Sequence, residues 1–466
     1  MPRPALPQTA SEPGGLVPRA GGPSPAAEAS QPGTEPAGNQ LQSIWAQDTL
    51  TGDWGGLRTK LSDAGITIGL QEQGEIWGNM AGGLKQGFAF NGLTTGSIKF
   101  DLDKLVGWTG ASLFASAFQI HGLGPSEALI GNAQLVSNIE ATPDTKLYNL
   151  WFEQTLFDGA LTIRFGQEGA NDQMMITQYG ALFLNSSFGF PGLPAANLPS
   201  GGPNYPMATP FVRIQYQPTD QITLVGAVFN SDPAPPGPGN PMQRDKGGVA
   251  FRLSGHALSF GELWYSVNQA DDAPGPPGTY KLGFWYDSST YPNQVYDTMG
   301  VPLASPASNG VPQPHSGTWA IYGIVDQMIW QKPNAKGQGI GVFLQVMGGP
   351  GAFTLSNLFV EGGINWIGPF EGRDKDVFGL AFSYLGTSPA KRAYGNDVIF
   401  YSRTGFPYTS NETVFEATYL YQANQWLSFQ PDLQVVINPN AAIPSSFSAV
   451  PLKDAVIAGV RVTIIF

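Results

Sequence analysis

The segment Val456–Phe466, VIAGVRVTIIF, decides the fold of this chain. Alternate residues of an extended strand point to opposite faces. Every second residue from Val456 to Phe466 is apolar, whereas Arg461 and Thr463 occupy positions between them. The segment is therefore predicted to be a β-strand with one apolar face and one mixed face that carries polar groups.

The same alternation recurs along the chain, at 146–156, 161–167, 412–423 and 427–437. Most of these runs are about ten residues long, which is the length that a tilted strand needs to cross a bilayer. Strands of soluble proteins average about five or six residues. From about Ile66 onward the sequence therefore predicts an all-β fold, a transmembrane antiparallel β-barrel.

Composition agrees with a membrane barrel and excludes several other classes of protein. Charged residues make up only 12% of the chain, against about 25% in a typical soluble domain. Aromatic residues also reach 12%, and 60 glycines and 40 prolines supply turns. The chain has no cysteine, which rules out disulfides and Cys-based zinc sites. Its 35 acidic residues outnumber 23 basic ones, which argues against nucleic acid as a partner. No run of about 18 apolar residues predicts a transmembrane helix.

The connections between strands predict where the chain turns. Short links alternate with long ones, as in transmembrane barrels with short periplasmic turns and long outer loops. Counting 248–254 as a strand would place the long loop 289–316 on the short-turn side, so we assign 248–254 to a loop. The count is then about sixteen strands, an even number with both termini periplasmic. The short links lie at 157–160, 218–221 and 424–425, and the long ones at 168–207, 230–257, 289–316, 387–411 and 438–453.

The sequence predicts that the chain is divided into three parts. Residues 1–45 are rich in Pro, Ala, Gly and Ser, so they are predicted to be a disordered leader or extension, with no ordinary signal peptide visible. Residues 46–65 are predicted to hold a short periplasmic helix, with Asp53 as its N-cap and Gly65 at its C-terminal end. Residues 66–466 form the predicted barrel.

Several motifs, taken together and in order, resemble one family of bacterial proteins. They are GDWGGLR at 52–58, QIHG at 119–122, SNIEA at 137–141, LWFEQ at 150–154, ALFLNS at 181–186, NLPSGGP at 197–203, GTYKLG at 278–283 and QPDLQ at 430–434. This set resembles the carbohydrate-selective porin (OprB-like) family of Gram-negative outer membranes, from about Gly52 to Phe466. The resemblance implies a sixteen-stranded outer-membrane barrel that passes sugars and excludes many charged solutes. A terminal aromatic residue also resembles the assembly signal of such barrels, so Phe466 is the expected contact of the barrel-assembly machinery.

A sugar pore needs hydrogen-bonding groups for hydroxyls and aromatic plates for the apolar C–H faces of the ring. The polar faces of the predicted strands supply both kinds of side chain. Glu153 and Arg164 lie on consecutive strands and are predicted to face each other, either to hold a sugar diol or as an ordinary salt bridge of the wall. The candidate lining residues are Trp151, Glu153, Arg164, Arg213, Gln215, Glu262, Trp264, Lys281, Trp285, Glu361, Glu416, Gln430, Asp432 and Arg461.

Two long segments are candidates for a loop that folds inward and narrows the pore. Segment 168–207 contains Asn185, Asn197 and Tyr205, and its several aromatic residues favour packing inside the barrel. Segment 121–146, with Asn138 and Glu140, is the second candidate.

Other functions remain open at the level of sequence. A secreted β-rich glycoside hydrolase would need two converging carboxylates, which Glu153, Glu262, Glu361 and Glu416 could supply. A plugged barrel with a structural or adhesive role is a further alternative. The three histidines show no metal-ligand spacing, and no cofactor motif occurs, so no metal or cofactor is expected. The expected partners are permeating sugars and outer-membrane lipid, and both a monomer and a homotrimer fit the sequence.

Overall fold

A computed structural model describes residues 47–270, 273–333, 335–403, 410–439 and 452–466. These residues form one closed antiparallel barrel in which each strand pairs with its neighbours in sequence and β1 pairs with β16. The all-β transmembrane-barrel prediction and the count of sixteen strands are confirmed. The strands are β1 Ile66–Gly83, β2 Gly87–Asp101, β3 Ala111–Gly122, β4 Asp144–Leu156, β5 Leu161–Glu168, β6 Thr209–Tyr216, β7 Ile222–Asn230, β8 Ala257–Val267, β9 Gly278–Asp297, β10 Pro312–Gln331, β11 Gly339–Gly348, β12 Ser356–Ile367, β13 Val377–Thr387, β14 Glu412–Gln422, β15 Leu427–Ile437 and β16 Lys453–Ile465.

Short helices occupy several of the connections between the strands. None of those in the described ranges combines the length and the hydropathy needed to span a bilayer. They are η2 Trp54–Gly56, α1 Leu57–Asp63, α2 Leu102–Val106, η3 Ser126–Ile130, η4 Ala170–Asp172, η5 Gly180–Leu182, η6 Ser186–Phe188, α3 Gly192–Asn197, η7 Pro199–Gly201, α4 Pro241–Arg244, η8 Lys246–Gly248 and α5 Pro389–Ser402.

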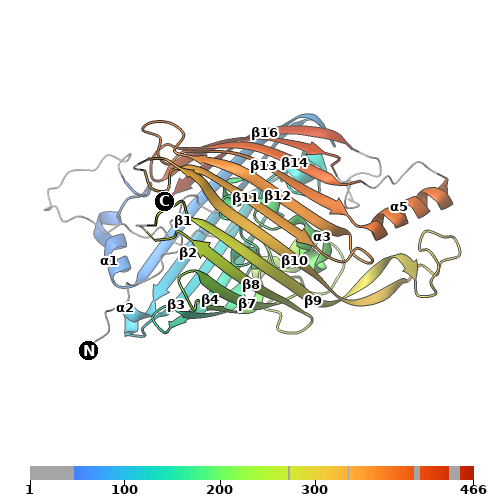
Figure 1. The fold of residues 1–466 in the computed structure, drawn as a ribbon, viewed down its shortest axis with the longest axis horizontal. Helices are drawn as coiled ribbons and strands as arrows, with labels where there is room; N and C mark the ends of the chain where they lie inside the picture. The colour runs from blue at the N-terminus through green and yellow to red at the C-terminus, as the bar shows by residue number, and fades with distance from the viewer. Residues whose placement is uncertain (1–46, 271–272, 334, 404–409, 440–451) are drawn as a thin grey trace.

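The two ends of the barrel differ (Figure 1). Helices α1 and α2 lie at one end, and α5 and the tip of β9 project from the other. The connection 231–256 contains the segment 248–254, as predicted. The prediction of a loop over 289–316 was wrong at its edges, because β9 continues to Asp297 and β10 begins at Pro312. Connection 387–411 contains the unpredicted helix α5, whose N-cap Ser388 accepts a hydrogen bond from the backbone of Lys391.

The outer face of the barrel is apolar and exposed. Along β13, for example, Phe378, Leu380 and Phe382 are exposed and alternate with buried residues. The same alternation on other strands exposes large apolar side chains such as Leu282 and Phe415. Side chains that would cost free energy in water are stable against hydrocarbon, so the outer belt of the barrel suits a bilayer.

The interior is packed more densely than the alternation alone suggests. Apolar side chains from the connection 169–208, among them Phe183 and Phe188, lie against Phe343 of β11 with ring centroids 5.7 and 6.0 Å apart. Leu184 is fully buried. The prediction that the apolar residues of this segment pack inside the barrel is confirmed.

The N-terminal helix differs slightly from its prediction. Helix α1 begins at Leu57 with Gly56 as N-cap, so Asp53 is not the capping residue of α1. Its carboxylate nevertheless accepts the backbone N–H of Thr59 in the first turn at 2.8 Å. Arg58 of the same helix donates to the carbonyl of Phe466 at 2.9 Å. The predicted boundary at residue 45 lies outside the described residues.

One side of the barrel has a low wall. Strands β5 and β6 have 8 residues each, whereas β9 and β10 have 20. The connection 231–256, here called the cover loop, lies beside this low wall, where the carbonyl of Gly248 accepts from the amide of Gln167 at 2.8 Å. A Cβ at Gly248 would lie 2.1 Å from the carbonyl oxygen of Leu147, and its φ is +65°, so only glycine fits this approach.

Candidate functional site

The connection between β5 and β6, residues 169–208 and here called the crossing loop, spans the interior of the barrel. Its backbone N–H groups reach acidic side chains of the wall. Glu416 of β14 accepts from the backbone of Leu184 at 2.6 Å and of Asn185 at 3.0 Å. Asp326 of β10 accepts from the backbone of Tyr179 at 3.1 Å. These carboxylates satisfy loop donors that would otherwise be buried without a partner.

Further wall residues hold the crossing loop through its carbonyl oxygens. Lys281 of β9 donates to Ile176 at 2.8 Å, and Gln430 of β15 donates to Leu182 at 2.8 Å. Asn365 of β12 donates to Tyr179 at 2.7 Å. The loop is therefore fastened to several strands around the barrel by hydrogen bonds of both polarities.

A second inner segment lies between β3 and β4, residues 123–143, here called the companion loop. Arg461 of β16 donates from Nε to Glu75 of β1 at 2.6 Å and from Nη2 to the Asn138 side chain at 2.6 Å. Glu412 of β14 accepts the backbone N–H groups of Ala133 and Gln134 at 2.9 and 2.7 Å. Asn79 of β1 also donates to Leu129 of the loop at 3.3 Å, so the companion loop is held to both strands of the closing seam and to β14.

Glu140 of the companion loop is buried. It accepts hydrogen bonds from the backbone of Ser126 at 2.9 Å and of Ser137 at 3.3 Å. Burial nevertheless dominates and raises the pKa of the Glu140 carboxyl to about 7, because the charged form loses its hydration.

Ionic and aromatic side chains form a cluster on β4, β5 and β6, here called the Arg164 cluster: Trp151, Glu153, Arg164, Glu168 and Arg213. Glu153 and Arg164 pair across the hairpin, as predicted, with Nε–Oε2 2.7 Å. A second oxygen, on Glu168, lies 3.2 Å from Arg164 Nη1. The guanidinium of Arg164 sits over the Trp151 ring at 4.1 Å, and Arg213 is the cross-strand neighbour of Arg164.

Solvent reaches part of the Arg164 cluster. The side chains of Arg164 and Glu153 are 14% and 20% exposed, although both belong to the inner face. Gln215 of β6 is also half-buried and lies beside Arg213 at 2.5 Å. This part of the inner wall therefore presents charged hydrogen-bonding groups and an aromatic plate next to water.

Other predicted lining residues join the wall to the crossing loop. Glu262 of β8 accepts from the backbone of Met175 at 2.8 Å and from the Trp264 indole at 2.6 Å. Lys281 lies 4.6 Å from the centre of the Trp264 ring. Trp264 and Lys281 remain half-buried rather than fully covered.

Some predicted lining residues are deep inside packed regions. Trp285 is fully buried in an apolar cluster, where its indole lies 3.5 Å from the sulfur of Met347. Glu361 is 1% and Asp432 5% exposed. The inner face was predicted correctly for these three residues, and their direct contact with a solute stays a prediction.

The residues predicted for the constriction hold the loops in place. Asn185 donates to Gln134 and to the Gln434 side chain, both at 3.1 Å. Asn197 accepts the backbone N–H groups of residues 355 and 356 at 3.0 and 3.1 Å. Tyr205 donates from its hydroxyl to Ile139 at 2.7 Å, which joins the two inner loops.

Comparison with known proteins identifies the family. The family model described as "Carbohydrate-selective porin, OprB family" matches residues 85–466, which is most of the chain. The chain belongs to this family. It is therefore an outer-membrane channel of the carbohydrate-selective porin family rather than a member of an enzyme family.

Relatives of this porin cover nearly its whole length. It is similar to Porin B of Pseudomonas aeruginosa, with 24% identity over 436 residues, 90% of this chain and 91% of the relative. It also resembles the putative porin QuiX of Acinetobacter baylyi, with 21% identity over 85% of this chain and 90% of the relative. The structure of Pseudomonas putida OprB at high pH matches with TM-score 0.79 and 22% identity, over 91% of this chain and all of that chain.

Several inner residues of this porin were not predicted from the sequence. Glu75 faces Arg461 because β1 and β16 pair, and Glu168 lies four residues beyond Arg164 on β5. Both positions follow from alternation, once the first and last strands are taken as neighbours and β5 is extended by one residue. Asp326 sits in the middle of β10, whose extent was not predicted.

Proposed function

We propose that this porin lets mono- and small oligosaccharides diffuse passively through a water-filled path beside the Arg164 cluster. The observation that carries the proposal is the partly exposed Glu153–Arg164 pair, with Arg164 stacked on Trp151 of the inner wall. Carboxylate and guanidinium groups hydrogen-bond hydroxyls, and an aromatic ring stacks on the apolar face of a sugar. Weak, reversible contacts of this kind favour entry without trapping the solute.

The crossing loop and the companion loop set the width of this path. Both are fastened to the wall by buried hydrogen bonds, which supports a fixed constriction rather than a freely moving flap. The proposed lining includes the predicted residues of β4–β9 that keep contact with solvent, namely Glu153, Arg164, Gln215, Trp264 and Lys281.

The proposed orientation places α1 and α2 in the periplasm and the long loops outside the cell. The connections at the α1 end include the short links 157–160 and 423–426, whereas the crossing loop and the cover loop lie at the other end. Short periplasmic turns and long extracellular loops are general in bacterial barrels.

Liposome swelling tests the sugar pathway. Vesicles that contain the purified porin are expected to swell faster in neutral monosaccharides than in charged solutes of equal size. Equal rates for neutral and charged solutes would contradict carbohydrate preference, and an absence of swelling from correctly folded porin would contradict the pore itself.

We further propose that the barrel-assembly machinery recognises the side chain of Phe466. Its backbone N–H donates to the carbonyl of Leu70 at 2.9 Å, which supports a role for this residue at the closing seam. Deletion of Phe466 is expected to lower the folded fraction in the outer membrane, measured by heat-modifiable gel mobility. Arg58→Ala is the matched control, because it removes the contact to the Phe466 carbonyl and keeps the aromatic ring; an equal defect in both variants would refute a specific role for the ring.

A further inference from the structure

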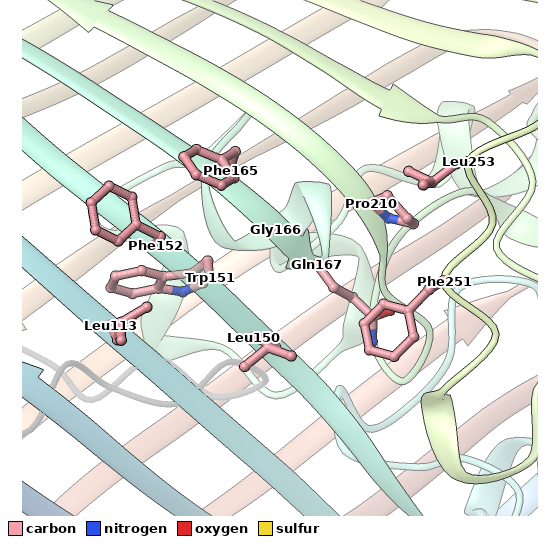
Figure 2. Close-up of a pocket in the computed structure, with 10 residues that line it drawn as sticks. All are labelled: Leu113, Leu150, Trp151, Phe152, Phe165, Gly166, Gln167, Pro210, Phe251 and Leu253. Carbon is pink, nitrogen blue, oxygen red and sulfur yellow. The ribbon is translucent and has the colours of Figure 1, made fainter.

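An apolar groove lies on the outer face of the low wall, behind the Arg164 cluster, with which it shares Trp151. Its volume is about 330 Å³, and ten residues of β3–β6 and the cover loop line it. Figure 2 shows Phe251 and Leu253 on the cover loop near Pro210 of β6, with Leu150 and Phe165 on the neighbouring strands. The ten residues are Leu113, Leu150, Trp151, Phe152, Phe165, Gly166, Gln167, Pro210, Phe251 and Leu253.

Hydrogen bonds to β4 and β5 fix the cover loop that forms one side of the groove. The outward side chain of Gln167 is 2% exposed and donates to Gly248 of the cover loop. Lys146 donates to Met242 of the same loop at 2.9 Å. These contacts hold the cover loop at the end of β5, so that the segment with Phe251 and Leu253 forms one side of the groove.

The side chains around the groove are apolar and open to the surroundings of the barrel. Leu150 is 43%, Phe165 48% and Leu253 89% exposed. Leu150 and Phe165 belong to the same outward faces as the apolar belt, so the groove continues the surface that meets hydrocarbon. Such exposure is unfavourable in water and is relieved by contact with another apolar molecule.

The cover loop also carries basic side chains, and Lys246 is the exposed one among Arg244, Lys246 and Arg252. Arg244 donates to the hydroxyl of Ser200 in the crossing loop at 3.2 Å, and Arg252 lies beside Asp232 at 3.3 Å, so both are already engaged. Lys246 lies two residues before Gly248, which accepts from Gln167 of the groove. The whole chain has a net charge of −12, so an exposed lysine at this place suits an anionic group.

We propose that the groove binds one acyl chain of lipid A, with a phosphate of its headgroup near Lys246. The apolar lining recognises the chain, and the exposed Lys246 recognises the phosphate. The choice of an outer-leaflet lipid rests on the orientation proposed above, because the groove lies near the loop end of β5 and β6. A stable protein interface buries about 800 Å² on each partner, and this narrow groove fits a flexible chain better than the face of a second copy.

Native mass spectrometry of the full-length porin in detergent tests the proposal. With added lipid A, the unmodified chain is expected to retain one lipid that the double variant F251S/L253S binds about tenfold or more weakly, since two apolar side chains no longer cover the acyl chain. L263S/F284S is the matched control, because Leu263 and Phe284 are exposed apolar residues of β8 and β9 outside the groove; it is expected to keep the affinity.

Two further variants test the apolar lining and the basic residue of the groove separately. Leu113→Trp fills the groove from β3 and is expected to lower lipid A retention without altering the cover loop. K246Q is expected to weaken the binding of lipid A more than the binding of phosphatidylethanolamine, which has no net charge. Equal loss in L263S/F284S, equal retention of phosphatidylglycerol and lipid A, or dimers in place of a lipid adduct would each overturn the proposal. Sugar-dependent swelling of F251S/L253S liposomes is expected to match the unmodified porin, which separates this proposal from the sugar pathway.

Discussion

Glu416 and Glu153 both point inward from barrel strands, yet their surroundings differ. Glu416 is 2% exposed and accepts two backbone N–H groups of the crossing loop. Glu153 is 20% exposed and pairs with Arg164 on the next strand. The comparison shows that the inner face contains two kinds of polar residue, one that fastens the loop and one that meets water.

Removing the fastening carboxylate is expected to have the largest effect. In Glu416→Ala the N–H groups of Leu184 and Asn185 lose their acceptor, at a cost of about 1–3 kcal/mol for each buried donor left unpaired. We expect the crossing loop to loosen and trisaccharides to enter faster relative to monosaccharides, measured by liposome swelling. Glu416→Gln keeps one acceptor oxygen and is expected to lie in between. An unchanged ratio of trisaccharide to monosaccharide rates would show that Glu416 does not hold the constriction.

Removing the water-facing cation is expected to change selectivity and leave the barrel assembled. Arg164→Ala leaves Glu153 and Glu168 without this counter-charge, so the path becomes more attractive to cations and its sugar permeation changes. Because Glu168 is only 2% exposed and loses this partner, the loss of stability is expected to exceed the roughly 1 kcal/mol of a surface ion pair, while strand pairing around the barrel keeps it assembled.

Reversal potentials and swelling rates measure the effect of Arg164→Ala, and heat-modifiable gel mobility checks assembly. Arg164→Lys is the control, since it keeps the charge and loses the forked guanidinium. Unchanged reversal potential and swelling across several sugars would place Arg164 among the residues that only shape the wall.

A smaller, pH-dependent effect is expected at the companion loop. The pKa of Glu140 is raised from 4.5 to about 7 by burial. A raised carboxyl pKa stabilises the folded loop fully below pH 4.5, and this contribution is lost as the pH rises through 7. Protease resistance of the companion loop is therefore expected to decrease as the pH rises from 4.5 to about 7. Glu140→Gln cannot titrate and is expected to remove this dependence; if the variant keeps it, another group is responsible.

Alternation predicted which side of the wall each residue occupies. It placed Glu153 opposite Arg164 and Arg461 on the inner face, because the two-residue period of a strand is set by local geometry. Alternation could not predict that Trp285 is fully buried, because its burial depends on Met347 from β11 and on the packing of the crossing loop. Such contacts join residues distant in sequence and leave no local signal.

Two other features were not predicted from the sequence. Ser388 followed by Pro389 is a typical helix start, and α5 begins there, so this local signal was available. The extension of β9 and β10 beyond the membrane-length range contains Pro292 and Pro314, and proline is uncommon inside strands, so the local sequence argues against it. Neither error touched the strand count, since both lie in connections at one end of the barrel.

The pairing of Glu75 with Arg461 joins residues 386 positions apart in the chain. All neighbouring strands except β1 and β16 are consecutive in sequence, so each of those pairs can form as a local hairpin. The seam between β1 and β16 instead needs both ends of the barrel sequence in place. Until then the sheet has two unpaired edges that could bind another chain. A chain interrupted before β16 could not close the ring, so β1 and β15 would each keep an unpaired edge.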